Sequence, residues 1–169
     1  AYRMLPHFLF QNPLCTATIS VSISRTGPSS RMAFCPAAMT LKEDLDVLAE
    51  ALPSQIDAIF LCHGIALKAD ASNALEVQKV NFLGHKYLLE KILPRIADNG
   101  SVNIIASTGG FGWQGVFVDC AAVVNAPSYE AALDWYETHP DVIRNGYVFS
   151  KQCLCAYVKM KVHAPEYIS

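Results

Sequence analysis

Hydrophobic residues recur at helical spacing soon after residue 40. Thr40-Leu-Lys-Glu43 fits a capping box, in which the threonine hydroxyl caps the first turn and the glutamate reaches back. The apolar positions that follow are Leu41, Leu45, Leu48, Ala49 and Leu52. Their spacing predicts a helix that begins at Thr40 and ends before Pro53.

Strand and helix patterns then alternate to the end of the chain. Short apolar runs predict buried strands at 57–61 and 101–106. Periodic apolar positions predict helices at 73–96, where Asn99-Gly100 is the stop signal, at 128–137 with Ser128 as cap, and at 146–163.

Residues 1–38 have a weaker pattern. Prolines are scattered through this stretch, and only Thr16–Ser24 alternates as a strand does. We therefore divide the chain into an irregular N-terminal stretch, 1–38, and one α/β domain, 39–169.

The alternation of strands and helices predicts the fold class. It indicates a Rossmann-like α/β fold, with a parallel sheet and helices on both faces. Ligands of such sheets bind beyond the carboxyl ends of the strands. Gly64 and Ser107 follow two of these predicted ends, so a site is expected there.

Composition narrows the function classes. The chain has 169 residues, 52% of them hydrophobic, and a formal net charge of -2. This near-neutral balance gives no electrostatic case for nucleic acid. No run of about 18 apolar residues indicates a membrane span. Cys62 and Cys153 lie in apolar segments rather than in a disulfide pattern, which favours a reducing, cytoplasmic setting.

The candidate chemistry is a tyrosine and a lysine four residues apart, Tyr147 and Lys151. Positions i and i+4 share a helix face, and a nearby ammonium stabilises a phenolate. Tyr87/Lys91 and Tyr157/Lys161 have the same spacing. Tyr147 differs in context, because it follows the turn signal Asn145-Gly146 and a strand that leads into Ser107.

Each candidate also has a structural interpretation. Tyr147 could be a packing aromatic with Lys151 as a solvated neighbour, Ser107 could cap a turn, and Asn81 could bond a neighbouring carbonyl. Two further chemistries are weighed and not favoured. Cys62-His63 as a nucleophile pair would have side chains on opposite strand faces, and Cys153-x-Cys155 with His163 lacks the spacing for zinc.

Four motifs together resemble the short-chain dehydrogenase/reductase family, in the family's order. They are Asp57–Gly64, which resembles the strand and turn Asn-Asn-Ala-Gly; Val80-Asn81-Phe-Leu-Gly84; Gly100–Ser107; and Tyr147-x-x-Ser-Lys151. The long interval from Ser107 to Tyr147 and the variant Leu61-Cys62-His63-Gly64 resemble the 3α-hydroxysteroid dehydrogenase/carbonyl reductase branch.

The resemblance implies an NAD(P)-dependent oxidoreductase that interconverts a carbonyl and a secondary alcohol by hydride transfer. Tyr147 would be the general acid or base, Lys151 would lower its pKa and bind the nicotinamide ribose, and Ser107 would hold the substrate oxygen. Asn81 would support a water chain to Lys151. The cofactor, NAD or NADP, would contact Leu61, Cys62 and Gly64 besides Tyr147 and Lys151. No metal is expected.

The family pattern is incomplete at both ends of the chain. The sequence has no Gly-x-x-x-Gly-x-Gly for the cofactor's pyrophosphate, and the family's closing strand and substrate loop are missing after Ser169. The alternative function is therefore a noncatalytic remnant of the family, and an epimerase-like relative is a third. A homodimer or homotetramer, formed by the helices that begin near Asn73 and Tyr147, is expected by the same analogy.

Overall fold

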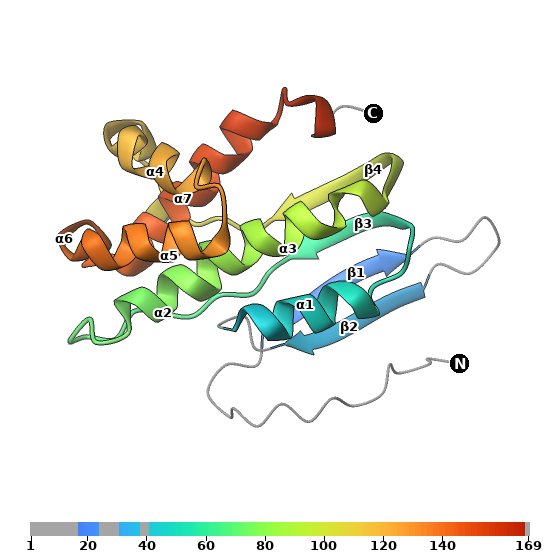
Figure 1. Cartoon of the computed structure of the whole chain (residues 1–169), viewed down its shortest axis with the longest axis horizontal. Helices are drawn as coiled ribbons and strands as arrows, with labels where there is room; N and C mark the ends of the chain where they lie inside the picture. The colour runs from blue at the N-terminus through green and yellow to red at the C-terminus, as the bar shows by residue number, and fades with distance from the viewer. Residues whose placement is uncertain (1–16, 24–30, 38–40, 168–169) are drawn as a thin grey trace.

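The computed structural model describes residues 17–23, 31–37 and 41–167, as a mixed α/β arrangement (Figure 1). The strands are β1 (Ala17–Ile23), β2 (Arg31–Ala37), β3 (Ile56–Leu61) and β4 (Ile96–Ile104). The helices are α1 (Lys42–Ala51), α2 (Ala74–Gln78), α3 (Gly84–Ile92), α4 (Phe117–Val124), α5 (Tyr129–Thr138), α6 (Pro140–Ile143) and α7 (Gly146–Lys161).

The sheet is mixed rather than parallel. Its strand order is β2-β1-β3-β4, and β3 and β4 are parallel to each other. β1 is antiparallel to both of its neighbours, as the arrowheads in Figure 1 show. The predicted parallel sheet is therefore correct for β3 and β4 alone among the described strands, because a hairpin occupies the place beside β3.

That hairpin lies in the stretch predicted to be irregular. β1 confirms the strand predicted from Thr16 to Ser24, within its described residues. β2 is not predicted, and it contains Pro36. Proline cannot donate to a ladder and is confined mainly to edge strands, and β2 is an edge of this sheet.

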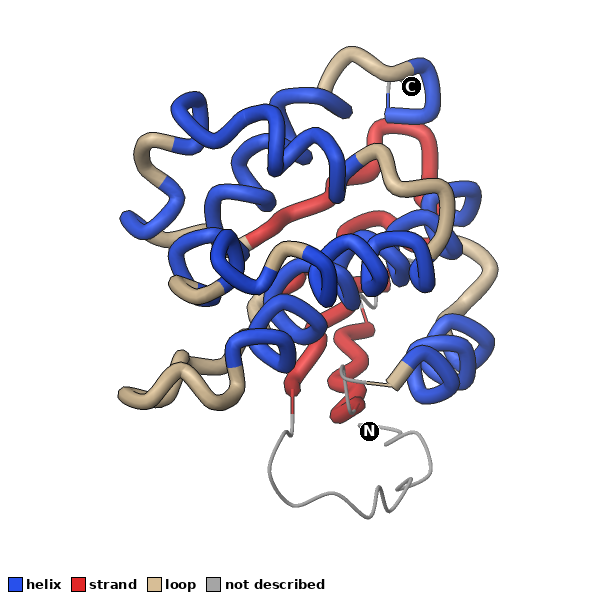
Figure 2. Tube along the Cα trace, turned by 60° about the vertical axis from the view of Figure 1, so that its left-hand side comes forward, coloured by secondary structure: helices blue, strands red, loops and turns tan. Residues whose placement is uncertain are grey.

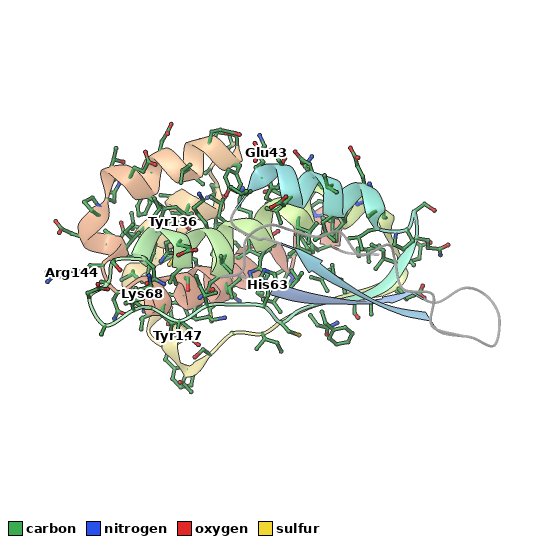
Figure 3. All side chains as sticks on the ribbon, turned by 90° about the horizontal axis from the view of Figure 1, so that it is seen from below. Glu43, His63, Lys68, Tyr136, Arg144 and Tyr147 are labelled. Atoms are coloured by element: carbon green, nitrogen blue, oxygen red, sulfur yellow. The ribbon has the colours of Figure 1, made fainter. Side chains whose placement is uncertain are left out.

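The described helices gather on one side of the sheet, so the prediction of helices on both faces is wrong for this part of the chain (Figure 3). The inward side chains of β3, such as Ile59 and Leu61, are fully buried in the core. On the other face Phe60 is 38% exposed, and Ile105, just past β4, is 55% exposed. Figure 2 shows the helices, in blue, packed beside the strands, in red, and passing in front of part of them.

The predicted helix 73–96 is a composite of shorter segments. α2 leads into a π-helical turn, Lys79–Leu83, then α3, and a 3₁₀ turn at Leu93–Arg95 ends it. The helix stops earlier than predicted because Pro94 follows α3 and β4 begins at Ile96. The stop signal Asn99-Gly100 lies inside β4, in a bulge between Ile96 and Ser101, where Asn99 has a φ of 62°.

The segment between Ser107 and Tyr147 folds back over the helices. The helix predicted at 128–137 is confirmed as α5, and the Ser128 hydroxyl caps it by accepting from the Ala131 N–H at 3.1 Å. Contacts of this segment with α3 and α7 include Lys86 Nζ to the Ala126 carbonyl at 3.1 Å, Tyr87 against Tyr129 and Trp135 against Phe149. The outer faces of α3 and α7 are thereby partly covered by the same chain.

The remaining helix predictions agree with the structure. α1 and α7 lie within the helices predicted from Thr40 and from Gly146. Thr40 itself, and with it the capping box, lies outside the described residues. None of the described helices has the length and apolar character to cross a membrane.

Candidate active site

The first turn of α7 is held tightly against α2. Gln78 Nε2 donates to the Gly146 carbonyl at 2.6 Å, in a buried position. A Cβ at Gly146 would lie only 3.0 Å from the Ala74 carbonyl oxygen, so glycine permits this close approach. The adjacent residue Tyr147 is therefore fixed by the docking of two helices.

Lys151 lies one turn further along α7 and faces Tyr147. Its side chain is 5% exposed, and its Nζ lies 5.8 Å from the centroid of the Tyr147 ring. Nζ also donates to the Ile105 carbonyl at 3.2 Å. Burial lowers the pKa of Lys151, and Tyr147 and Cys155 oppose that shift. No described residue bonds the Tyr147 hydroxyl, which leaves it available to a ligand.

Ser107 comes to the same place from the end of β4. A Cβ placed on Gly109 would have Tyr147 Cε1 at 3.5 Å and Ser107 Oγ at 3.7 Å, so both side chains border one small volume. Figure 3 shows Tyr147 beside the turn that follows β4. Ser107 Oγ also accepts from the Gly109 N–H at 3.2 Å. The structural role of a turn cap is thus present, and the hydroxyl donates its proton to no other described residue.

Asn81 lies in the π-helical turn and is fully buried. Its side chain clamps the backbone of Ile65, with Oδ1 accepting from the N–H at 2.7 Å and Nδ2 donating to the carbonyl at 3.0 Å. Nδ2 also approaches Ser150 Oγ at 3.4 Å, and Ser150 donates to the Tyr147 carbonyl at 2.7 Å. Asn81 therefore connects the loop after β3 to the first turn of α7.

The three residues predicted to contact the cofactor besides Tyr147 and Lys151 differ in what they can contribute. Leu61 is fully buried in the core, so its side chain has no access to a ligand. Cys62 is exposed. Gly64 lies against Asn81, where a Cβ would meet Oδ1 at 3.2 Å. Any contact from this segment would be made by its backbone and by Cys62.

The two rival tyrosine-lysine pairs are engaged elsewhere. Tyr87 donates to Asp46 at 2.7 Å, and Lys91 pairs with the same carboxylate at 2.7 Å. The Tyr157 hydroxyl lies 2.5 Å from the Tyr167 hydroxyl. The structure therefore distinguishes the Tyr147 pair by its position at the carboxyl ends of the parallel strands.

Two buried histidines lie beside this site; the sequence suggests His63 only as a partner of Cys62 and does not single out His85. His63, just after β3, stacks on His85 of α3 with ring centroids 3.8 Å apart. Burial lowers the pKa of His63 to about 3, and Lys151 adds to that shift. The pairing joins a strand end to a helix 22 positions away in sequence, so no local pattern reveals it. His63 is buried while Cys62 is exposed, as expected for neighbours on opposite faces.

The described part of the chain contains no group of three metal-binding side chains. Cys153 is buried, and burial raises the pKa of its thiol well above the usual value. An inert thiol suits its position in the core.

A cavity of about 250 Å³ lies away from these residues. It is bordered by the first part of β4 and the last turns of α7, including Tyr157, Lys161 and Tyr167. We assign the candidate site by the convergence at Tyr147, because this cavity is at the opposite end of α7 and offers no comparable set of reactive groups.

Comparison with known proteins places the chain near an alcohol-oxidising enzyme. It is 26% identical over 142 residues to coniferyl-alcohol dehydrogenase of Pseudomonas sp. (strain HR199 / DSM 7063). The chain is a distant relative of a dehydrogenase. The match covers 83% of this chain and 54% of the relative, so the chain spans about half the relative's length. No family model matches the sequence, and no solved structure matches it significantly.

Proposed function

We propose that this chain belongs to a short-chain dehydrogenase/reductase that interconverts an alcohol and a carbonyl compound with NAD or NADP. The convergence of Tyr147 and Ser107 on one volume, with buried Lys151 against the tyrosine ring, carries the proposal. The resemblance to a dehydrogenase along most of the chain supports it independently.

Tyr147 moves the proton in this mechanism. Its hydroxyl gives a proton to the carbonyl oxygen during reduction and takes one from the alcohol during oxidation. The Lys151 ammonium lies 5.8 Å from the centroid of the tyrosine ring, where it would bind the ribose of the nicotinamide. The Ser107 hydroxyl donates to the substrate oxygen and holds it beside the tyrosine. Asn81 holds the loop after β3 and the first turn of α7 in register.

The cofactor fits the site at one end. NAD or NADP, when bound, supplies or accepts the hydride at its nicotinamide. Tyr147, Lys151 and the backbone at Gly109, which lies against the Tyr147 ring and the Ser107 hydroxyl, suit the nicotinamide end. The pyrophosphate end has no counterpart in the described residues, because the strand beside β3 is antiparallel and brings no glycine-rich loop to this edge.

That mismatch favours a second candidate, a remnant without a competent cofactor site. In this alternative the proton-transfer residues persist but no nicotinamide is held beside them. Binding of cofactor, rather than the geometry at Tyr147, distinguishes the two functions.

The substrate is part of the proposal. The name of the relative makes coniferyl alcohol the first alcohol to test. A hydroxysteroid is the second, because the long Ser107–Tyr147 interval resembles that of the 3α-hydroxysteroid dehydrogenase/carbonyl reductase branch. The relative found by comparison does not support this substrate.

The cofactor test is a titration of the full chain with NADH and with NADPH, followed by nicotinamide fluorescence. We expect saturable binding of at least one of them in the micromolar to millimolar range. Titration to millimolar concentrations without saturation would exclude the enzyme function for this chain and leave the remnant.

A homodimer or homotetramer remains a prediction. The segment of α4 and α5 covers part of the helix faces that motivated it, so an assembly would use what stays exposed, such as Val158 and Val162 on and just after α7. Gel filtration with light scattering gives the mass directly, and a monomer at micromolar concentration would refute the assembly.

A further inference from the structure

The stacked rings of His63 and His85 contain three buried nitrogens that have no partner among the described residues. The two side chains are 5% and 1% exposed, and their planes are inclined by 20°. His63 Nδ1, His63 Nε2 and His85 Nε2 have no hydrogen-bond partner within the described chain. Buried polar groups without partners cost free energy, so a pair of this kind calls for a reason.

The fourth nitrogen has a defined partner. His85 Nδ1 lies 2.8 Å from the carbonyl oxygen of Asn81. A carbonyl only accepts, so Nδ1 carries the proton and the tautomer of His85 is fixed. The Asn81 carbonyl lies within the π-helical turn, where the regular α-helical ladder is interrupted.

The bond to Asn81 connects the imidazole pair to the proposed site. From Asn81 the side-chain bonds run to Ile65 in one direction and to Ser150 in the other, and Ser150 bonds the backbone of Tyr147. A shift of the Asn81 peptide would therefore move both the loop after β3 and the tyrosine. The stack with His63 holds the His85 ring in the orientation that makes this bond.

We propose that His85, held by its stack with His63, is a positioning residue that fixes Asn81 and through it the geometry around Tyr147. The effect of His85 on catalysis rests on the proposed function. Its effect on the position of Asn81 rests on the hydrogen-bond network alone. Neither histidine touches the reacting atoms in this role.

The role requires both imidazoles to be neutral, and their surroundings keep them so. Burial is the main cause that lowers both pKa values. Lys151 on α7 lowers both pKa values further, while the hydrogen bond to the Asn81 backbone raises the pKa of His85. Two neutral rings can stack at 3.8 Å without the repulsion that a charged pair would have.

The chain offers a matched control. His139 also bonds a carbonyl four residues earlier, with Nδ1 2.8 Å from the Trp135 oxygen, and its ring stacks on Trp135 at 4.2 Å. It is exposed and lies outside the network. His85→Phe removes the donor and keeps a ring, His85→Asn offers an amide N–H in its place, and His139→Phe makes the same change at the control position.

The deciding measurement is amide hydrogen exchange of Ile65, the donor to Asn81 Oδ1, in these variants of the full chain. We expect about tenfold faster exchange at Ile65 in His85→Phe, substantial rescue in His85→Asn and no change in His139→Phe. Unchanged exchange at Ile65 in His85→Phe, or equal acceleration at every buried amide, would overturn the role.

A kinetic arm separates this inference from the proposed function. If the wild-type chain oxidises an alcohol, His85→Phe should lower kcat about tenfold with little change in KM, and His85→Asn should restore most of it. A wild-type chain without activity contradicts the proposed function, and the exchange at Ile65 then still decides the positioning role.

Discussion

The spacing of Tyr147 and Lys151 indicates a site only together with the residues around the pair. Three pairs share the spacing, and the sequence distinguishes Tyr147 by the turn before it and by the strand that leads to Ser107. In the structure the other two tyrosines are bonded to Asp46 and to Tyr167, whereas none of the described residues bonds the Tyr147 hydroxyl. The spacing of a tyrosine and a lysine predicts that they share a helix face. The residues that pack opposite that face come from distant segments, so the local sequence does not predict them.

Ser107 combines a structural and a proposed catalytic role, which substitution can separate. Ser107→Ala should lower the rate of alcohol oxidation about tenfold or more, because the substrate oxygen loses a donor. It should reduce stability by about 1 kcal/mol or less through loss of the turn cap. Steady-state kinetics and urea unfolding measure the two effects.

Ser128→Ala is the control, because Ser128 caps α5 by a similar bond, 3.1 Å long. This bond lies away from the proposed site. It should lose similar stability and keep its activity. Equal losses of activity in both variants would assign Ser107 a structural role alone.

At the scale of elements, predictions succeed where the signal is local. α5 and α7 follow from cap and turn residues next to periodic apolar positions. The predicted end of the helix before β4 is wrong, because the apolar pattern continues past Pro94. The expected stop signal, Asn99-Gly100, forms a bulge within the strand. The π-helical turn at Asn81 depends on tertiary contacts, and no residue pattern marks it.

The docking of α7 on α2 gives a test at this scale. Gly146→Ala adds a Cβ that would lie 3.0 Å from the Ala74 oxygen and 3.2 Å from its Cα. Backbone cannot retract as a side chain can, so we expect a stability loss of about 1–3 kcal/mol and reduced activity from a displaced Tyr147. Urea unfolding and kinetics give both values.

Gly115→Ala is the matched control, because no atom lies within 4 Å of its added Cβ. It should change stability by less than about 0.5 kcal/mol. A Gly146→Ala variant as stable as Gly115→Ala would show that the two helices do not approach as closely as described.

For the whole molecule, alternation of strands and helices predicts the α/β class but not the sheet. Strand direction and the face that helices cover depend on how distant segments meet. The hairpin β1–β2 beside β3 therefore escapes prediction, as does the open sheet face with Phe60. Both features involve β3, the strand that leads to the segment proposed to contact the cofactor, so cofactor binding is the property that distinguishes the two candidate functions.

Stability of the whole chain should fall in mild acid. The pKa of His63 is about 3 in the folded chain and near 6.5 when unfolded, so the unfolded state binds the extra proton between these values. The free energy of unfolding is therefore retained above about pH 6.5 and lost as the pH falls below it, by at most about 1.4 kcal/mol per pH unit for each proton.

His63→Phe should flatten this dependence in urea unfolding at pH 7 and pH 5, because one of the titrating groups is removed. His139→Phe, at an exposed position, should keep the wild-type dependence. A His63→Phe variant with the same slope as the wild type would mean that His63 is not buried in its neutral form.

The central claim is that Tyr147 transfers the proton in an alcohol oxidation. The most direct measurement is the rate at which the full chain reduces NAD or NADP with coniferyl alcohol, compared among wild type, Tyr147→Phe and Tyr87→Phe. We predict that Tyr147→Phe loses about 10²–10⁴-fold in kcat, while Tyr87→Phe, whose tyrosine bonds Asp46, stays within a few-fold of wild type. An active wild-type chain whose rate is unchanged by Tyr147→Phe would contradict the account.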